Sequence, residues 1–247
     1  MTKIIVEICC GSADDVIQAK KAGADRVELN SCLFLGGLTP SIGELEVAKK
    51  TGLPIMTMVR PREAGFCYTD AEYETMLCDA RALLERGADG IVFGFLHEDG
   101  TIDIERCKEM LKITGKKTSV FHRAFDVVPD WHAAMETLID LGVNRILTSG
   151  QEPTVPEGAD TIREMIEYAA GRIEILPGAG ITLKNAKNIV AKTNCSQIHA
   201  AIPKNCRDIS ASGNPEIFFG GALYPPEDRF YMMDAQKIQE LTQIVNP

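Results

Sequence analysis

The chain has 247 residues, of which 45% are hydrophobic and 25% are charged, and its formal net charge is -9 at pH 7. That length fits one eight-unit α/β barrel or two small domains, and the acidic balance argues against nucleic acid as a partner, because nucleic-acid binders usually carry a basic face. No signal-peptide pattern opens the chain, and no apolar run approaches the roughly 20 residues that cross a membrane. We therefore expect a cytoplasmic protein that handles small molecules and makes no contact with a membrane.

Cysteine is frequent in the chain, with eight residues at positions 9, 10, 32, 67, 78, 107, 195 and 206. No two of them have the C-x-x-C spacing of a zinc site, so a structural zinc ion is not expected. In a reducing cytosol they should be free thiols, and most of them should serve as small core residues.

Glycines that are typical of helix ends recur at intervals of 27 to 35 residues, which is the length of one strand–loop–helix unit. After each of them comes a short run of β-branched or aromatic residues and then an amphipathic stretch. These glycines are Gly23, Gly52, Gly87, Gly115, Gly142 and Gly171, and the predicted strands are residues 4–9, 26–30, 54–60, 90–96, 118–123, 144–149, 173–177 and 197–201.

The alternation of strands and helices predicts a parallel sheet, and eight such units predict a (β/α)8 barrel that forms a single domain over residues 1–247. The alternative is an open doubly wound sheet, which would need a Gly-rich phosphate-binding turn after an early strand; residues 8–12 do not provide one. Helices are predicted at residues 14–22, 70–86, 104–113 and 129–141, with N-caps at Ser12, Ser41, Asp130 and Thr182.

The last part of the chain is less regular. Residues 204–231 are rich in Gly, Pro, Ser and Asn, which predicts a long irregular loop over one end of the barrel. Residues 234–245 have the pattern of a closing helix.

Polar side chains at the predicted strand ends indicate a site at the carboxyl-terminal mouth of the barrel. Alternate residues of a strand share a face, so Cys9 should point the same way as Glu7, and Asn30 the same way as Glu28. The alternative is a structural salt-bridge network, with any histidine a satisfied core residue. The polar cluster expected at the mouth consists of Glu7, Glu28, Arg60, His122 and His199.

Three arginines at strand ends, together with Ser149 and the glycines at 178 and 180, are typical of a site that holds a phosphate or carboxylate. In an enzyme acting on such an anion, Glu7 or Glu28 would be the base and His122 the acid or electrophile. The predicted substrate-binding residues are Arg60, Arg62, Arg123, Asp126, Ser149 and His199.

Several long motifs resemble those of the CutC family, over about residues 3 to 180. They are residues 6–9, 23–29, 36–41, 59–62, 87–94, 121–126 and 145–150. The resemblance implies a cytoplasmic barrel protein of copper homeostasis in which cysteine thiols bind Cu(I), a soft ion that thiolate and thioether ligands favour. Cys9 matches the first family cysteine, but Asn30 stands at the position of the second. Cys32, two residues on, is then the candidate for the second metal ligand if the loop turns inward, and Cys9 with Cys10 is another possible pair.

Three functions therefore remain open. The first is binding or buffering of copper, with Cys9 and either Cys32 or Met58 as ligands. The second is an enzyme acting on a small anionic substrate, and the third is a regulatory or interaction module without turnover. The partner is accordingly a copper ion or a small anionic ligand, and a homodimer is left open.

Overall fold

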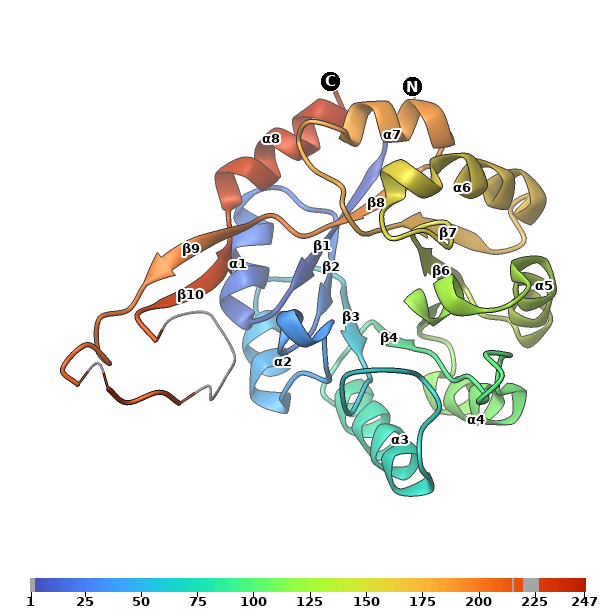
Figure 1. Cartoon of the computed structure of the whole chain (residues 1–247), viewed down its shortest axis with the longest axis horizontal. Helices are drawn as coiled ribbons and strands as arrows, with labels where there is room; N and C mark the ends of the chain where they lie inside the picture. The colour runs from blue at the N-terminus through green and yellow to red at the C-terminus, as the bar shows by residue number, and fades with distance from the viewer. Residues whose placement is uncertain (1–2, 215, 220–226) are drawn as a thin grey trace.

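A parallel eight-stranded sheet closes almost completely into a barrel at the centre of the molecule (Figure 1). The computed structural model describes residues 3–214, 216–219 and 227–247. The strands follow in the order β7-β6-β5-β4-β3-β2-β1-β8, and β7 meets β8 through a parallel bridge between Gly178 and His199. This confirms the predicted (β/α)8 fold. The barrel strands are β1 (Ile5–Cys10), β2 (Arg26–Leu29), β3 (Ile55–Met58), β4 (Gly90–Phe93), β5 (Thr118–Phe121), β6 (Arg145–Thr148), β7 (Glu174–Pro177) and β8 (Gln197–Ala200).

The α-helices lie around the barrel and cover its outer face (Figure 1). Two 3-10 turns, η1 (Leu33–Leu35) and η2 (Arg123–Val127), follow β2 and β5 at the mouth. The helices of the described residues are α1 (Ala13–Lys21), α2 (Ile42–Lys49), α3 (Asp70–Glu85), α4 (Ile104–Thr114), α5 (Trp131–Leu141), α6 (Val155–Ala169), α7 (Ala186–Thr193) and α8 (Ala235–Val245).

Three of the four predicted N-caps are confirmed. The side chains of Ser12, Ser41 and Asp130 accept hydrogen bonds from backbone N–H groups in the first turns of α1, α2 and α5. The prediction for Thr182 was wrong, because α7 begins only at Ala186. The Asn185 amide oxygen accepts from the Thr182 N–H at 2.7 Å, so residues 182–185 form a turn ahead of the helix.

Two apolar regions pack on the two sides of the sheet. The larger one fills the space between the strands and the helices, and it includes Cys10, whose side chain lies on the opposite face of β1 from Cys9. The smaller one fills the inside of the barrel and consists of Met56, Met58, Val92, Val120, Leu147 and Leu176.

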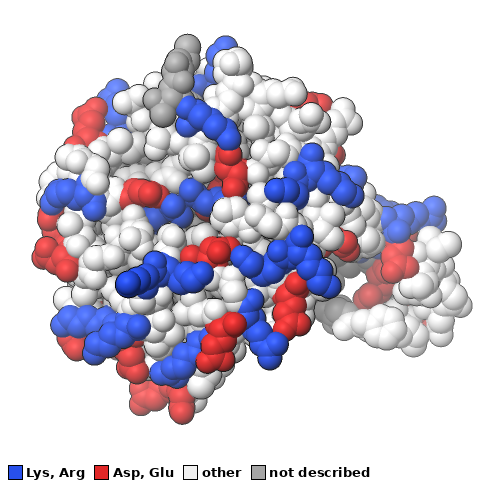
Figure 2. All heavy atoms as spheres, turned by 180° about the vertical axis from the view of Figure 1, so that it is seen from behind, with Lys and Arg blue, Asp and Glu red and all other residues white. Residues whose placement is uncertain are grey.

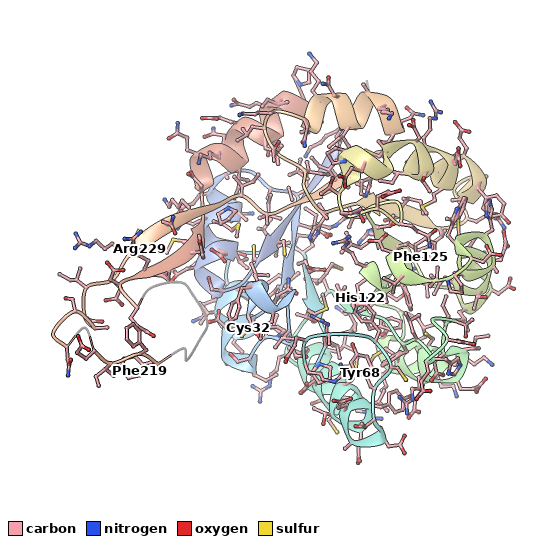
Figure 3. All side chains as sticks on the ribbon, viewed as in Figure 1. Cys32, Tyr68, His122, Phe125, Phe219 and Arg229 are labelled. Carbon is pink, nitrogen blue, oxygen red and sulfur yellow. The ribbon has the colours of Figure 1, made fainter. Side chains whose placement is uncertain are left out.

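An antiparallel hairpin extends away from the barrel before the last helix (Figure 1). Its strands are β9 (Pro203–Arg207) and β10 (Arg229–Met233), so both ends of the segment predicted as irregular are paired strands. Figure 3 shows Phe219 and Arg229 on this arm, apart from the barrel, and Phe219 is 78% exposed. Residues 215 and 220–226 of the predicted loop lie outside the described residues.

Charged side chains of both signs are mixed over the face of the molecule that is seen in Figure 2. Some of them form exposed ion pairs, such as Lys192 with Asp160 at 2.9 Å. Among the described residues, none of the helices has the length and apolar character needed to cross a membrane.

Candidate functional site

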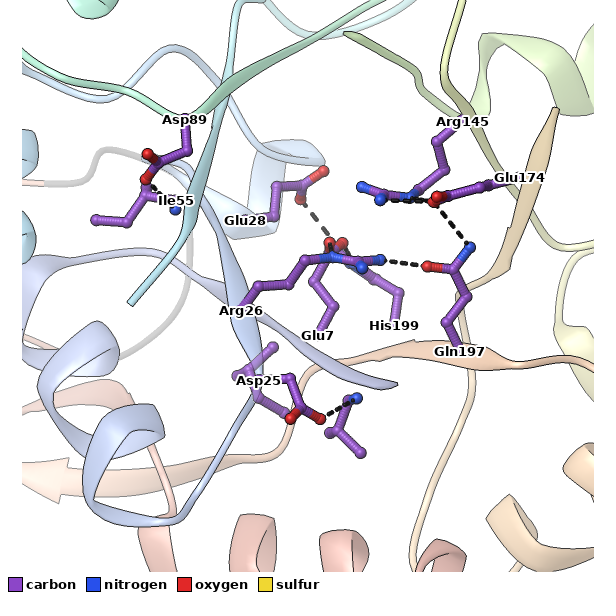
Figure 4. A network of polar contacts seen from close by, with 12 residues as sticks. Glu7, Asp25, Arg26, Glu28, Ile55, Asp89, Arg145, Glu174, Gln197 and His199 are labelled. Carbon is purple, nitrogen blue, oxygen red and sulfur yellow. Dashed lines mark hydrogen bonds and ion pairs between the residues drawn. The ribbon is translucent and has the colours of Figure 1, made fainter. Parts of the chain in front are cut away.

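A network of charged side chains, most of them buried, runs through the inside of the barrel (Figure 4). At its amino-terminal end, Arg145 donates to Glu174 at 2.6 Å, and Gln197 donates to the same carboxylate at 3.4 Å. Arg26 donates to both Gln197 and Glu7, which lies opposite it in the β1–β2 register. These contacts connect the first residues of four strands with the centre of β1.

The same network continues toward the mouth through His199. Its Nδ1 lies 2.8 Å from Glu7 Oε1, and its Nε2 lies 3.8 Å from Glu28 Oε2. Asn30 Nδ2 donates to Glu28 at 2.8 Å, and Cys9 Sγ lies 3.6 Å from the same carboxylate. The ligand atoms of Cys9, Glu28 and His199 all lie within 4.8 Å of one another, which makes them a candidate metal site in the described part of the chain.

Burial and the neighbouring charges determine the protonation of this cluster. Burial alone would raise the pKa of Glu7, but the hydrogen bond with His199 and the charge of Arg26 outweigh it and lower that pKa to about 2. Burial raises the pKa of Glu28, and it raises the pKa of the Cys9 thiol to about 12. Burial alone would lower the pKa of His199; the facing Glu28 and the hydrogen bonds with Cys9 and Glu7 raise it instead. His199 therefore lies between two carboxyl groups that favour its protonated form.

A cavity of about 510 Å³ opens above this cluster. Cys9, Glu28 and His199 lie along it, together with residues 178–182 of the loop after β7. The cavity therefore brings a thiol, a carboxyl group and an imidazole together with three further polar side chains, which are Arg60, His122 and Arg123.

Arg60 and His122 are buried against the cavity. Arg60 donates to the carbonyl groups of Leu35, Gly37 and Ala64, so its guanidinium fastens the loops after β2 and β3. His122 Nδ1 accepts from the Ala124 N–H at 3.1 Å. Burial and the charge of Arg60 lower the pKa of His122 to about 3, so the ring is neutral at pH 7.

The comparisons with known proteins agree with this architecture. The sequence pattern of the CutC family matches residues 4–203. The chain belongs to the CutC family. A CutC family protein from Treponema denticola is 55% identical over 99% of both chains. The human copper homeostasis protein cutC homolog is 40% identical over 97% of this chain and 88% of its own length.

A solved CutC structure has the same fold. The crystal structure of the putative copper homeostasis protein CutC from Streptococcus agalactiae is 35% identical and covers 79% of this chain and 97% of its own, with a TM-score of 0.76. Phosphoribosyl anthranilate isomerase is only 13% identical, over all of this chain and 99% of its own, with a TM-score of 0.54, so it supports the barrel fold alone.

Asn30 occupies the position at which the resemblance to the CutC family predicted a second thiol. The Asn30 amide nitrogen lies 3.6 Å from Cys9 Sγ and also holds Glu28, so the amide orients the cluster. Cys32 is exposed, has a left-handed backbone with φ 47°, and does not line the cavity. The structure therefore does not bring Cys32 to Cys9, and His199 takes the place beside the thiol.

The other predicted site residues differ in whether they lie at the cavity. Arg123 lines the cavity and donates to Asp126 and Ser149, both at 2.7 Å, so Asp126 and Ser149 support it from behind. Arg62 does not line the cavity, because it donates to Glu72 at 2.6 Å on the outer side of the loop after β3.

The sequence analysis did not predict the amino-terminal end of the charge network. Arg26 lies two residues before Glu28 on β2, so the alternation rule that placed Glu28 inside the barrel also places Arg26 there. Arg145, Glu174 and Gln197 are likewise at strand starts, whereas the predicted polar cluster came from residues near the strand ends.

His122 should make the fold sensitive to acid. The unfolded chain takes up a proton near pH 6.5, whereas folded His122 stays neutral down to about pH 3. Its stabilising contribution is thus complete above pH 6.5 and is lost at about 1.4 kcal/mol per pH unit as the pH falls toward 3. His122→Asn keeps an acceptor for the Ala124 N–H but does not titrate. Urea unfolding from pH 7 to 4 should show a shallower loss for His122→Asn, and a loss equal to that of the wild type would contradict this assignment.

Proposed function

We propose that this CutC-family chain acts in copper homeostasis by binding Cu(I) at the floor of the barrel mouth, with Cys9 and His199 as the donors. The observation that carries the proposal is the approach of Cys9, Glu28 and His199 to within 4.8 Å. Ligands about 2.0–2.3 Å from one ion are at most about 4.6 Å apart, so the side chains need to move only slightly. Thiolate and imidazole are both ligands that copper accepts.

The surroundings of the three donors fit a cation. Glu28 Oε2 faces both Cys9 Sγ and His199 Nε2, and Oε1 of the same carboxyl group is buried without a hydrogen-bond partner among the described residues, so a cation here would compensate a poorly satisfied carboxylate. Cys9 and His199 both lose a proton when they bind a metal ion, and copper would supply the charge that replaces the imidazolium beside Glu7 and Glu28. Met58 also lines the cavity and offers a thioether nearby.

We place this function in a reducing compartment such as the cytoplasm. All eight cysteines are free thiols, and Cys9 and Cys10 lie next to each other on opposite faces of β1. A chain that uses a reduced thiol as a copper ligand requires surroundings that keep it reduced.

The proposal predicts that Cys9→Ser removes tight Cu(I) binding. Under anaerobic conditions, a chromophoric Cu(I) chelator should lose copper to the wild-type protein, and Cys9→Ser should compete at least 10-fold less well. Cys32→Ser is the matched control, because it removes an exposed thiol outside the cavity and should bind like the wild type. Undiminished binding by Cys9→Ser, or a loss confined to Cys32→Ser, would refute this site.

A further inference from the structure

We propose that the barrel mouth holds a second site, which binds a small organic ligand through a phosphate-like oxyanion. It lies above the copper donors, between Arg60 and His122 on one wall and Arg123 with the loop of residues 178–182 on the other. The proposal does not depend on copper binding. A cavity of about 510 Å³ is far larger than a single ion requires and is in the range of small-molecule sites.

Arg60 carries a buried charge that no carboxylate balances among the described residues. The residue is 6% exposed, and its guanidinium donates to three carbonyl groups and lies 5.5 Å from the centroid of the Phe66 ring. Its Nε is buried without an acceptor. A buried charge without a counterion is costly, so an anion in the adjacent cavity would stabilise it.

His122 offers a second donor to the same space. Its Nδ1 accepts the Ala124 N–H, so the neutral ring carries its proton on Nε2. Nε2 is buried without a partner in the described residues, and the ring lines the cavity. An oxyanion accepts from this N–H, whereas a metal ion would not bind a protonated nitrogen.

The opposite wall supplies backbone donors. Residues 178–182 line the cavity, and Ala179 and Gly180 have left-handed φ angles of 94° and 76°. In the described structure, the N–H groups of Gly180 and Ile181 make no hydrogen bond to protein, whereas Ala179 lies next to the bridge between Gly178 and His199. Consecutive free N–H groups in such a loop form a concave site for an anion. Arg123 stands next to this wall, with its side chain 41% exposed.

The net negative charge of the chain limits which groups could bind phosphate. A chain with a net charge of -9 repels phosphate in general, so binding has to come from local donors. Glu28 lies on the floor of the same cavity, which suits a ligand with one anionic end and a neutral, hydroxyl-bearing remainder. Small phosphorylated metabolites have this chemistry.

Inorganic phosphate is the probe for the test, used with copper-free full-length protein and with chloride at matched ionic strength. Phosphate at about 100 times its Kd should raise the Tm by roughly 5–10 °C, and chloride should not. Arg123→Gln should weaken phosphate binding at least 10-fold in calorimetry, while Arg123→Lys should retain most of it.

Arg62→Gln is the matched control, because Arg62 has similar exposure but lies outside the cavity. Its phosphate affinity should equal that of the wild type. A Tm that rises equally with phosphate and chloride would overturn the proposal, and so would equal weakening in Arg62→Gln and Arg123→Gln. Neither result would affect the copper site, which is measured without phosphate.

Discussion

Glu7→Gln should lower the free energy of unfolding by about 3–5 kcal/mol at pH 7, because it leaves the buried charges of Arg26 and His199 without their shared carboxylate. Urea denaturation with circular dichroism measures this change. Lys192→Ala is the control, since it breaks an exposed ion pair with Asp160 and should leave stability nearly unchanged. Equal effects of the two substitutions would show that the barrel network contributes little.

Glu7→Gln should also change how the free energy of unfolding falls at low pH. Glu7 has a folded pKa of about 2 against an ordinary value of 4.5, so its contribution is complete above pH 4.5 and disappears as the pH falls toward 2. In this window Glu7→Gln should lose less stability than the wild type. A parallel curve would contradict the assigned ionisation of Glu7.

Gly158→Ala should destabilise the protein by about 3 kcal/mol or more, at the upper end of overpacking effects. A Cβ at Gly158 would lie 2.0 Å from the backbone oxygen of Ser149, so α6 would have to move away from the loop after β6. That movement would also disturb Ser149, which holds Arg123 at the mouth.

A second helical glycine provides the control for this prediction. In Gly43→Ala the new Cβ meets nothing closer than Ser41 Oγ at 3.8 Å, and the residue is exposed in the first turn of α2. That substitution should raise stability by roughly 0.5–1 kcal/mol through helix propensity. Thermal unfolding of both variants distinguishes a steric effect from a general effect of alanine, and a stable Gly158→Ala would show that α6 can shift freely.

The sequence predicted the barrel because its strand–helix period repeats, and each unit contributes its own signal. Glu7, Cys9 and Glu28 could be placed inside by strand alternation, since all three lie within strands whose register is fixed by the buried face. His199 joined them because β8 pairs with β1 in the closed barrel.

Side-chain directions in the loops could not be predicted by strand alternation. Arg60 and Arg62 have the same parity, but β3 ends at Met58, so alternation no longer applies after it. Arg60 turns to the cavity, whereas Arg62 turns to Glu72 at the start of α3. Cys32 likewise follows the end of β2, and a left-handed backbone sends it outward. Loop directions depend on tertiary contacts, such as those of Arg60 with the carbonyl groups of Leu35 and Gly37, which no local pattern encodes.

The most direct test of the copper site is X-ray absorption spectroscopy of the anaerobic protein loaded with one equivalent of Cu(I). Coordination by Cys9 and His199 predicts one sulfur at about 2.3 Å and nitrogen at about 2.0 Å, with the sulfur signal absent in Cys9→Ser. A copper site without a sulfur ligand, or a spectrum unchanged by Cys9→Ser, would contradict the assignment of copper to the barrel mouth.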